Sequence, residues 1–489
     1  MTLTKYVGIL ASGLALTGAA SAQGTDTTSE LAQLKAEVAA LKSQNGDKWL
    51  TEERAAEIKS LVKDVLADSE TRTSLQGSGA TSGYNNGFFI SSADGNFKLQ
   101  LGLLAQARFT WNYQPGKNIP GVTPTTSGTG DGASTWAFEN RRTQMAFSGN
   151  IVDPSWTYMA KLNVGSTIDP YTPTSGGVVL QDAWVNKDFG NGFGVKVGQF
   201  KSPFMAESLR NDGAQLTAER SVVDYYFSGG YTQGLLASYS SDQFRAMGSY
   251  NNGPRSQNGS WASNTNNSIS LAGRVEFKAM GSWAQFDSES SAKSDESGLV
   301  IGAAIQYYNN RGDTSGSTGW NPAVTSAIYG DIAGTTPQPT TTGAVDWTVD
   351  ATFKSAGFSL SAAFVGANYG NETSVSGPVT TENSYAGVLQ GGYRFNDTLE
   401  AFGRWEWMNV ANGANDVGGA VDSATDVNNI LTFGVNVYAG SNIKWTTQWG
   451  ISLSDIGTGT DFSGAGYQAD ANTDSANQMN VISQLQIMF

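Results

Sequence analysis

Lysine and arginine carry the main chemical signal of this sequence, because the residue types that most enzymes use are missing. The 489-residue chain contains no cysteine and no histidine. It therefore has no thiolate nucleophile, no disulfide, no histidine general base and no Cys/His zinc site. No nucleophile–base pair stands out among the other residues. We therefore expect no enzymatic activity, no cofactor and no metal site.

The basic side chains occupy polar positions in segments where apolar and polar residues alternate. In residues 156–164, for example, Lys161 lies between Ala160 and Leu162. This alternation places successive side chains on opposite faces of a β-strand. If the apolar positions form one face, the basic residues of the other face are Lys98, Arg108, Arg142, Lys161, Lys196, Arg245, Arg274, Lys278, Lys354, Arg394, Arg404 and Lys444. The acidic residues of that face are Asp182, Glu276, Asp346, Asp350, Glu400 and Glu406.

The excess of bases gives the polar face a charge of about +6, although the whole chain has a formal net charge of −14. Basic rings favour anions in a narrow pore. The candidate anion contacts lie on the predicted strands and on the connection over residues 205–228, and they are Arg142, Lys161, Lys196, Lys201, Arg220, Arg245 and Arg274. An alternative interpretation is that these are ordinary wall charges, paired with nearby acids. The acidic net charge argues against non-specific binding of nucleic acid.

The elements that must position these residues are long strands. Charged residues make up 15% of the chain, against about 25% in ordinary soluble domains, and 59 residues are glycine. This composition is too poor in charge and too rich in glycine for a helical protein. Sixteen alternating segments occur between residues 97 and 489, and most are long enough to cross a bilayer as tilted strands.

The connections between these segments alternate in length, and aromatic residues gather near the strand ends. Short connections such as 190–192 alternate with long ones such as 205–228, while 281–297 is long where a short turn is expected. We predict an all-β fold, a sixteen-stranded antiparallel transmembrane β-barrel over residues 96–489 with its short turns in the periplasm. The alternative is a secreted β-sandwich or β-helix, whose strands are usually shorter.

The N-terminal residues predict export and a helical stalk. Residues 1–22 have the features of a signal peptide, since the apolar run is too short for a transmembrane anchor. Residues 29–68 predict a short α-helical coiled coil in the periplasm, with the seam residues Leu31, Leu34, Val38 and Leu41. The alternative is an amphipathic helix that lies on the barrel or plugs it. Residues 69–95 are rich in Ser, Gly, Thr and Asn and predict a flexible linker.

A series of short motifs resembles the phosphate-selective porin O/P family. In chain order they occupy residues 87–90, 94–99, 106–109, 141–142, 181–185, 197–204 and 219–221. The terminal Phe489, preceded by alternating apolar residues, is similar to the C-terminal signal that the barrel assembly machinery reads. The best match covers about residues 84–235. The resemblance implies a trimeric sixteen-stranded porin, with a third external loop, residues 205–228, that folds inwards; a solvated surface loop is the alternative. It does not identify the solute.

These observations predict an outer-membrane porin, a passive diffusion channel for small hydrophilic solutes with a preference for anions, phosphate among them. The expected partners are outer-membrane lipid, two further copies in a homotrimer, the barrel assembly machinery and small anionic or polar solutes. A second interpretation is a structural protein whose stalk tethers the outer membrane to the cell wall. No nucleic acid is expected as a partner.

Overall fold

The computed structural model describes two units of the chain to different extents. In the first unit, residues 1–78, the described residues are 35–37 and 59–60, which are helical. The second unit, residues 79–489, is described over 79–116, 130–164, 177–259, 269–309, 340–372, 382–410, 426–454, 463–467 and 477–489. The predicted signal peptide and the seam residues Leu31, Leu34, Val38 and Leu41 lie outside the described residues, so the coiled coil stays a prediction. Among the residues described, no helix is both long and apolar enough to cross a membrane.

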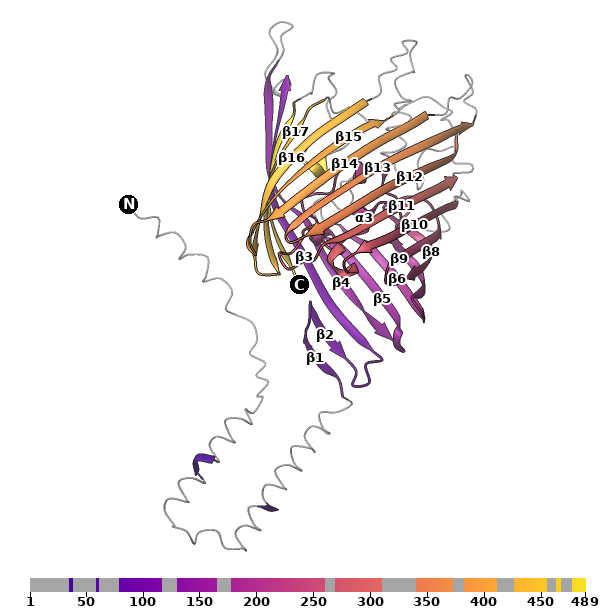
Figure 1. Ribbon diagram of the computed structural model, residues 1–489, viewed down its shortest axis with the longest axis vertical. Helices are drawn as coiled ribbons and strands as arrows, with labels where there is room; N and C mark the ends of the chain where they lie inside the picture. Colours follow the sequence, from indigo (N-terminus) through magenta and orange to yellow (C-terminus); the bar gives the residue numbers. More distant parts are fainter. Residues whose placement is uncertain are drawn as a thin grey trace, which may run out of the picture. The chain divides into compact units, whose positions relative to one another are not determined.

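Sixteen antiparallel strands of the second unit close into a barrel (Figure 1). Each strand pairs with the next, and the last pairs with the first in the register Ser483↔Phe109. The strands are β3 (Lys98–Gly116), β4 (Gly130–Ile151), β5 (Asp153–Val164), β6 (Val178–Gly190), β7 (Phe193–Lys201), β8 (Tyr231–Ser240), β9 (Phe244–Asn251), β10 (Ile269–Met280), β11 (Gly298–Asn309), β12 (Thr340–Ser355), β13 (Phe358–Glu372), β14 (Glu382–Arg394), β15 (Leu399–Val410), β16 (Asp426–Ala439), β17 (Ile443–Ser452) and β18 (Met479–Met488). The predicted sixteen-stranded barrel is confirmed.

Apolar side chains point out of the barrel and polar side chains point in. In β17, Lys444 and Gln448 are buried, whereas Trp445 and Trp449 are 56% and 42% exposed. This distribution is the reverse of that in a soluble protein. It suits a wall whose outer face meets lipid and whose inner face meets water.

The sequence predicted a flexible linker over residues 69–95, but part of this segment forms strands. The strands β1 (Thr81–Tyr84) and β2 (Phe88–Ser91) form a hairpin, and β2 extends the sheet by pairing with β3. The turn between them uses left-handed backbone at Asn86 and Gly87, residue types that adopt positive φ readily. The Phe88 ring packs edge-on against Phe489, with 5.7 Å between centroids. The polar residues of this segment are typical of a linker, so the sequence did not predict these two short strands. The pairing of β2 with β3 stabilises the hairpin.

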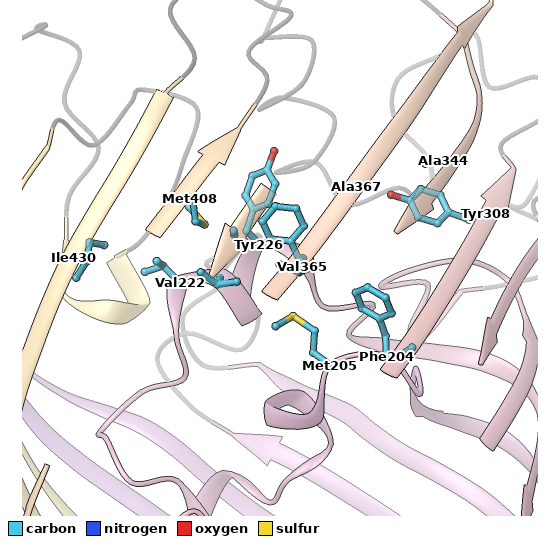
Figure 2. Packing of buried hydrophobic residues seen from close by; sticks show 14 of the residues in the cluster. Phe204, Met205, Val222, Tyr226, Tyr308, Ala344, Val365, Ala367, Met408 and Ile430 are labelled. Carbon is cyan, nitrogen blue, oxygen red and sulfur yellow. The ribbon is translucent and has the colours of Figure 1, made fainter. Parts of the chain in front are cut away.

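A cluster of buried apolar side chains lies inside the barrel (Figure 2). The connection between β7 and β8 carries the short helices α3 (Ala206–Leu209), η2 (Asp212–Ala214) and α4 (Val222–Phe227). Its side chains Phe204, Met205, Val222 and Val223 are at most 2% exposed. The wall residues of this cluster are Ala304, Tyr308, Ala344, Val365, Ala367, Ala386, Met408 and Ile430. Each fully buried side chain of this size contributes about 1.5–3 kcal/mol, so the connection is anchored to the β11–β16 half of the wall.

Candidate functional site

Residues 205–228, here called the constriction loop, cross the interior of the barrel. Lys444 of β17 donates from Nζ to the Gln215 carbonyl at 2.7 Å, and Asn436 of β16 donates from Nδ2 to the Leu216 carbonyl at 2.8 Å. Both wall residues point inwards and are buried. The prediction that this loop folds inwards is therefore confirmed, and the solvated surface loop is wrong. Lys444, which the sequence placed on the polar face, holds the loop backbone.

A β-bulge turns two consecutive arginines into the lumen. In the pairing of β3 with β4, Gln106 is opposite Arg142 and Ala107 is opposite Asn140, so Arg141 has no opposite residue. Strict alternation would send Arg141 into lipid, where an arginine costs about 2–4 kcal/mol at the midplane. The bulge avoids this cost and lets both guanidinium groups reach the constriction loop.

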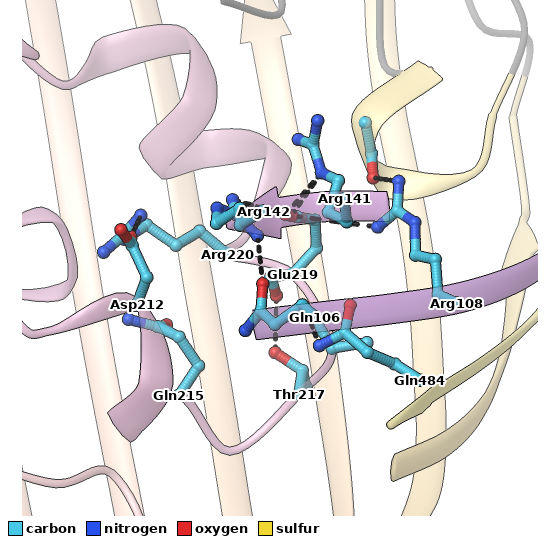
Figure 3. Close-up of polar contacts among 12 residues, drawn as sticks. Gln106, Arg108, Arg141, Arg142, Asp212, Gln215, Thr217, Glu219, Arg220 and Gln484 are labelled. Atoms are coloured by element: carbon cyan, nitrogen blue, oxygen red, sulfur yellow. Dashed lines mark hydrogen bonds and ion pairs between the residues drawn. The ribbon is translucent and has the colours of Figure 1, made fainter. Parts of the chain in front are cut away.

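Glu219 of the constriction loop receives both arginines (Figure 3). Its carboxylate lies 3.1 Å from Arg141 Nε and 2.5 Å from Arg142 Nη2, with Arg108 Nη1 at 3.9 Å. Burial would raise the pKa of Glu219, but the three arginines outweigh burial and hold the pKa at about 2. Glu219 is therefore ionised at neutral pH, although its side chain is 5% exposed.

A second ion-pair cluster joins the loop to β7. Asp212 lies 2.5 Å from Arg220 Nη1 and 4.0 Å from Lys201 Nζ. Burial again acts to raise the pKa of Asp212, but Arg220, Lys201 and Arg142 bring the pKa well below its usual range. Lys201 also donates to the Ser208 carbonyl at 2.7 Å. Two of the predicted anion contacts, Lys201 and Arg220, thus also fix the loop.

The other predicted contacts are spread along the wall. Lys161 pairs with Asp182 at 2.8 Å, and Lys196 lies over the Trp184 ring, 4.1 Å from its centroid. Towards the short-turn end of the barrel, Arg245 lies 4.0 Å from the centroid of the Trp283 ring.

Arg274 is buried and paired with two acids. It is 1% exposed and forms ion pairs with Asp350 at 2.7 Å and with Glu276 at 2.9 Å. Pairing with acids therefore describes Lys161 and Arg274, as it does Arg142, Lys201 and Arg220. Lys196 and Arg245 instead face aromatic rings.

Two cavities border the constriction loop. The outer cavity, of about 170 Å³, includes residues of the long connections near the β4–β8 wall. Its charged lining comprises five basic and three acidic side chains, namely Arg141, Arg142, Lys201, Arg220, Arg255, Asp212, Glu219 and Asp224. The inner cavity, of about 620 Å³, lies nearer the short turns. Its charged lining is balanced and comprises Arg210, Arg245, Arg274, Glu276, Asp287 and Asp350.

The structure brings Arg142, Lys201 and Arg220 together in the outer cavity and places Arg245 and Arg274 in the inner one. Lys161 adjoins the outer group, because Lys161 and Lys201 both lie over the Tyr231 ring, at 5.4 and 5.6 Å. Lys196 lines neither of these two cavities.

Sequence reasoning missed Arg141, Glu219 and Arg255 as lining residues. Adjacent arginines in a membrane strand were a usable signal, because only one of two neighbours can face the lumen without a bulge. Within the described ranges, no group of three or more acidic residues is arranged to hold a metal ion.

Comparison with known proteins agrees with this architecture. A sequence model of the phosphate-selective porin O and P family matches residues 123–452, which extends well beyond the stretch of best resemblance that ends near residue 235. OmpF of Salmonella typhi, solved in complex with daunomycin, has a TM-score of 0.50 at 14% identity, over 84% of this chain and 100% of its own. OprB of Pseudomonas putida has a TM-score of 0.50 at 10% identity, over 80% of this chain and 94% of its own. An anion-selective porin from Comamonas acidovorans has a TM-score of 0.48 at 10% identity, over 80% of this chain and 99% of its own. No curated protein sequence matches the chain.

Proposed function

Since this chain belongs to the phosphate-selective porin O and P family, we propose that it is an outer-membrane diffusion channel whose outer cavity favours small anions. The barrel supplies a wall with an apolar outer face and a polar inner face. The constriction loop narrows the interior from one side. Solutes pass along this loop, through the two cavities that border it.

The observation that carries the anion preference is the excess of basic side chains around the outer cavity. All three of its acids are already paired with bases, Glu219 and Asp212 with several bases each and Asp224 with Arg220. The lining therefore leaves a net positive charge for a passing ion. A unit charge about 4 Å away is worth about 4 kcal/mol at an effective dielectric constant near 20. Several such charges attract an anion and repel a cation.

The inner cavity does not contribute a preference of its own. Its three bases and three acids balance, and Arg274 is held between Asp350 and Glu276. We therefore place the selective step in the outer cavity, where Arg142, Lys201 and Arg220 meet. The inner cavity then serves as an aqueous exit.

Replacement of the conducted ions tests this proposal. In a planar bilayer, exchanging chloride for a bulky organic anion should lower the single-channel conductance strongly. Exchanging potassium for a bulky organic cation should lower it little. The opposite order of these two effects would refute the anion preference while leaving the porin function intact.

The assembly of the channel is a separate proposal. We propose a homotrimer with a periplasmic stalk, because the heptad spacing of residues 29–68 favours self-association. Replacing Leu34, Val38 and Leu41 with Asp would place unpaired charge in the seam. A peptide of residues 25–70 should then lose helicity and self-association. A wild-type peptide that is monomeric and unstructured at high concentration would refute the stalk, and with it the cell-wall tether that the stalk would serve.

A further inference from the structure

A second segment enters the lumen from the opposite end to the constriction loop. Residues 281–297, here called the inner turn, join β10 to β11 and begin with the short helix η3 (Trp283–Phe286). Trp283 donates from Nε1 to the Ser241 carbonyl at 2.9 Å. Ser241 belongs to the short turn between β8 and β9, so the inner turn starts at the short-turn end of the barrel.

Buried wall residues hold the inner turn inside the barrel. Lys354 of β12 donates from Nζ to the Gln285 carbonyl at 2.6 Å and to the Ser290 carbonyl at 2.8 Å. The Ser290 hydroxyl donates to Glu400 of β15 at 2.5 Å. Lys354 and Glu400 are both 0% exposed. Two ionisable residues on the polar face therefore hold a folded segment rather than line open water.

The inner turn meets the constriction loop at Glu289. The Glu289 backbone N–H donates to the Ala214 carbonyl at 2.9 Å, and its carboxylate accepts from the Leu216 N–H at 2.8 Å. The same carboxylate accepts from Gln390 of β14 at 2.9 Å and lies 3.5 Å from Arg210 Nη1. Glu289 is 4% exposed. One buried carboxylate therefore joins the loop, the inner turn and the wall.

We propose that Glu289 is a positioning residue of the pore and that the constriction is formed by two segments entering from opposite ends of the barrel. This inference rests on the proposed porin function. The inner cavity is bordered by Arg210 and Asn211 of the loop and by Trp283 and Phe286 of the inner turn. The width of the path at this level therefore depends on how the two segments are joined. The constriction loop cannot shift here without breaking its contacts with Glu289.

Loss of the Glu289 carboxylate should make the pore fluctuate. In Glu289→Ala, the Leu216 N–H and the Gln390 amide lose their acceptor in a buried place, which favours loop positions that restore solvation. We expect single-channel records of this variant to show extra current levels about ten times as often as wild type, a change of about 1.4 kcal/mol. Glu289→Gln keeps one acceptor oxygen and should be intermediate.

The matched control is Glu296→Ala, which removes an exposed acid from the same inner turn. Its single-channel records should show extra current levels as rarely as those of wild type. If Glu289→Ala reaches the membrane and is as quiet as Glu296→Ala, the positioning role is wrong. A wild-type channel that conducts no ions would instead refute the porin function.

A cross-link tests the same joint if Glu289→Ala fails to assemble. The chain has no native cysteine, and the Ser288 hydroxyl lies 3.5 Å from the Ala214 carbonyl oxygen. In the double variant Ala214→Cys, Ser288→Cys, oxidation should join the constriction loop to the inner turn by a disulfide. The voltage at which the channel closes should then rise, and a reductant should reverse this rise. Identical closing voltages before and after confirmed disulfide formation would overturn the proposal.

Discussion

Replacing Glu219 with glutamine removes the acid that the arginines of the outer cavity share. The side chain keeps its shape and one acceptor oxygen, so Arg141 and Arg142 retain a hydrogen-bond partner. Because the pKa of Glu219 is about 2, the substitution removes a full negative charge at neutral pH. The lining changes from five bases and three acids to five bases and two acids. We therefore expect the anion preference to increase.

The size of this effect follows from the distance to the permeating ion. A unit charge about 8 Å away is worth about 0.5 kcal/mol at a dielectric constant of about 80 and about 2 kcal/mol at about 20. The smaller energy favours the anion and disfavours the cation to the same extent, so the ratio of anion to cation permeability changes by about 1 kcal/mol, or about fivefold, since about 1.4 kcal/mol is tenfold. Salt screens charges over about 10 Å at 0.1 M and about 3 Å at 1 M, so the effect should fade at high salt.

Reversal potentials of wild type and Glu219→Gln in the same low-salt KCl gradient measure this change. Glu296→Gln, which removes an exposed acid from the inner turn, should leave the potential unchanged. An unchanged or reduced anion preference in Glu219→Gln, in a barrel that is folded and conducts, would refute the assignment of the outer cavity as the selective region.

Two further substitutions and one deletion test other parts of the molecule. Burial and the nearby acids raise the pKa of Glu207 to about 8. The anion preference should therefore fall between about pH 7 and about pH 9 as this carboxyl ionises, and Glu207→Gln should flatten the fall in reversal-potential measurements. Phe204→Ala should destabilise the loop anchor by about 3–5 kcal/mol and increase current noise, and unchanged noise would contradict the role of the apolar cluster. Deleting Phe489 removes the residue that forms two backbone hydrogen bonds with Leu103 of β3. The shortened chain should accumulate in the periplasm, and normal outer-membrane levels would contradict the role of Phe489 in assembly.

The sequence predicted the barrel well because strand alternation reflects a direct physical demand. Lipid outside and water inside impose a period of two on every strand, and β17 follows it from Ile443 to Ser452. The exceptions were informative. Val365 and Ala367 of β13 point inwards although they are apolar, because the constriction loop packs on them. These two apolar residues at inward positions mark the place where the loop is anchored. They can be interpreted in this way only once the loop is known to fold inwards.

The candidate site was predicted in part. The pattern of single strands assigns Lys161 and Arg274 to the inner face, but it cannot show that Asp182 and Asp350 pair with them across neighbouring strands. The role of Glu289 could not be predicted from the sequence for a similar reason. The unusual length of the inner turn was visible in the sequence, but its contacts with the constriction loop arise between segments far apart in the chain.

The most direct test of anion selectivity is the reversal potential of the wild-type channel in a planar bilayer under an about tenfold KCl gradient at low ionic strength. The outer cavity predicts a potential with the sign of the chloride equilibrium potential, and a smaller potential when the same gradient is imposed at high salt. A potential with the sign of the potassium equilibrium potential would contradict the anion-selective outer cavity.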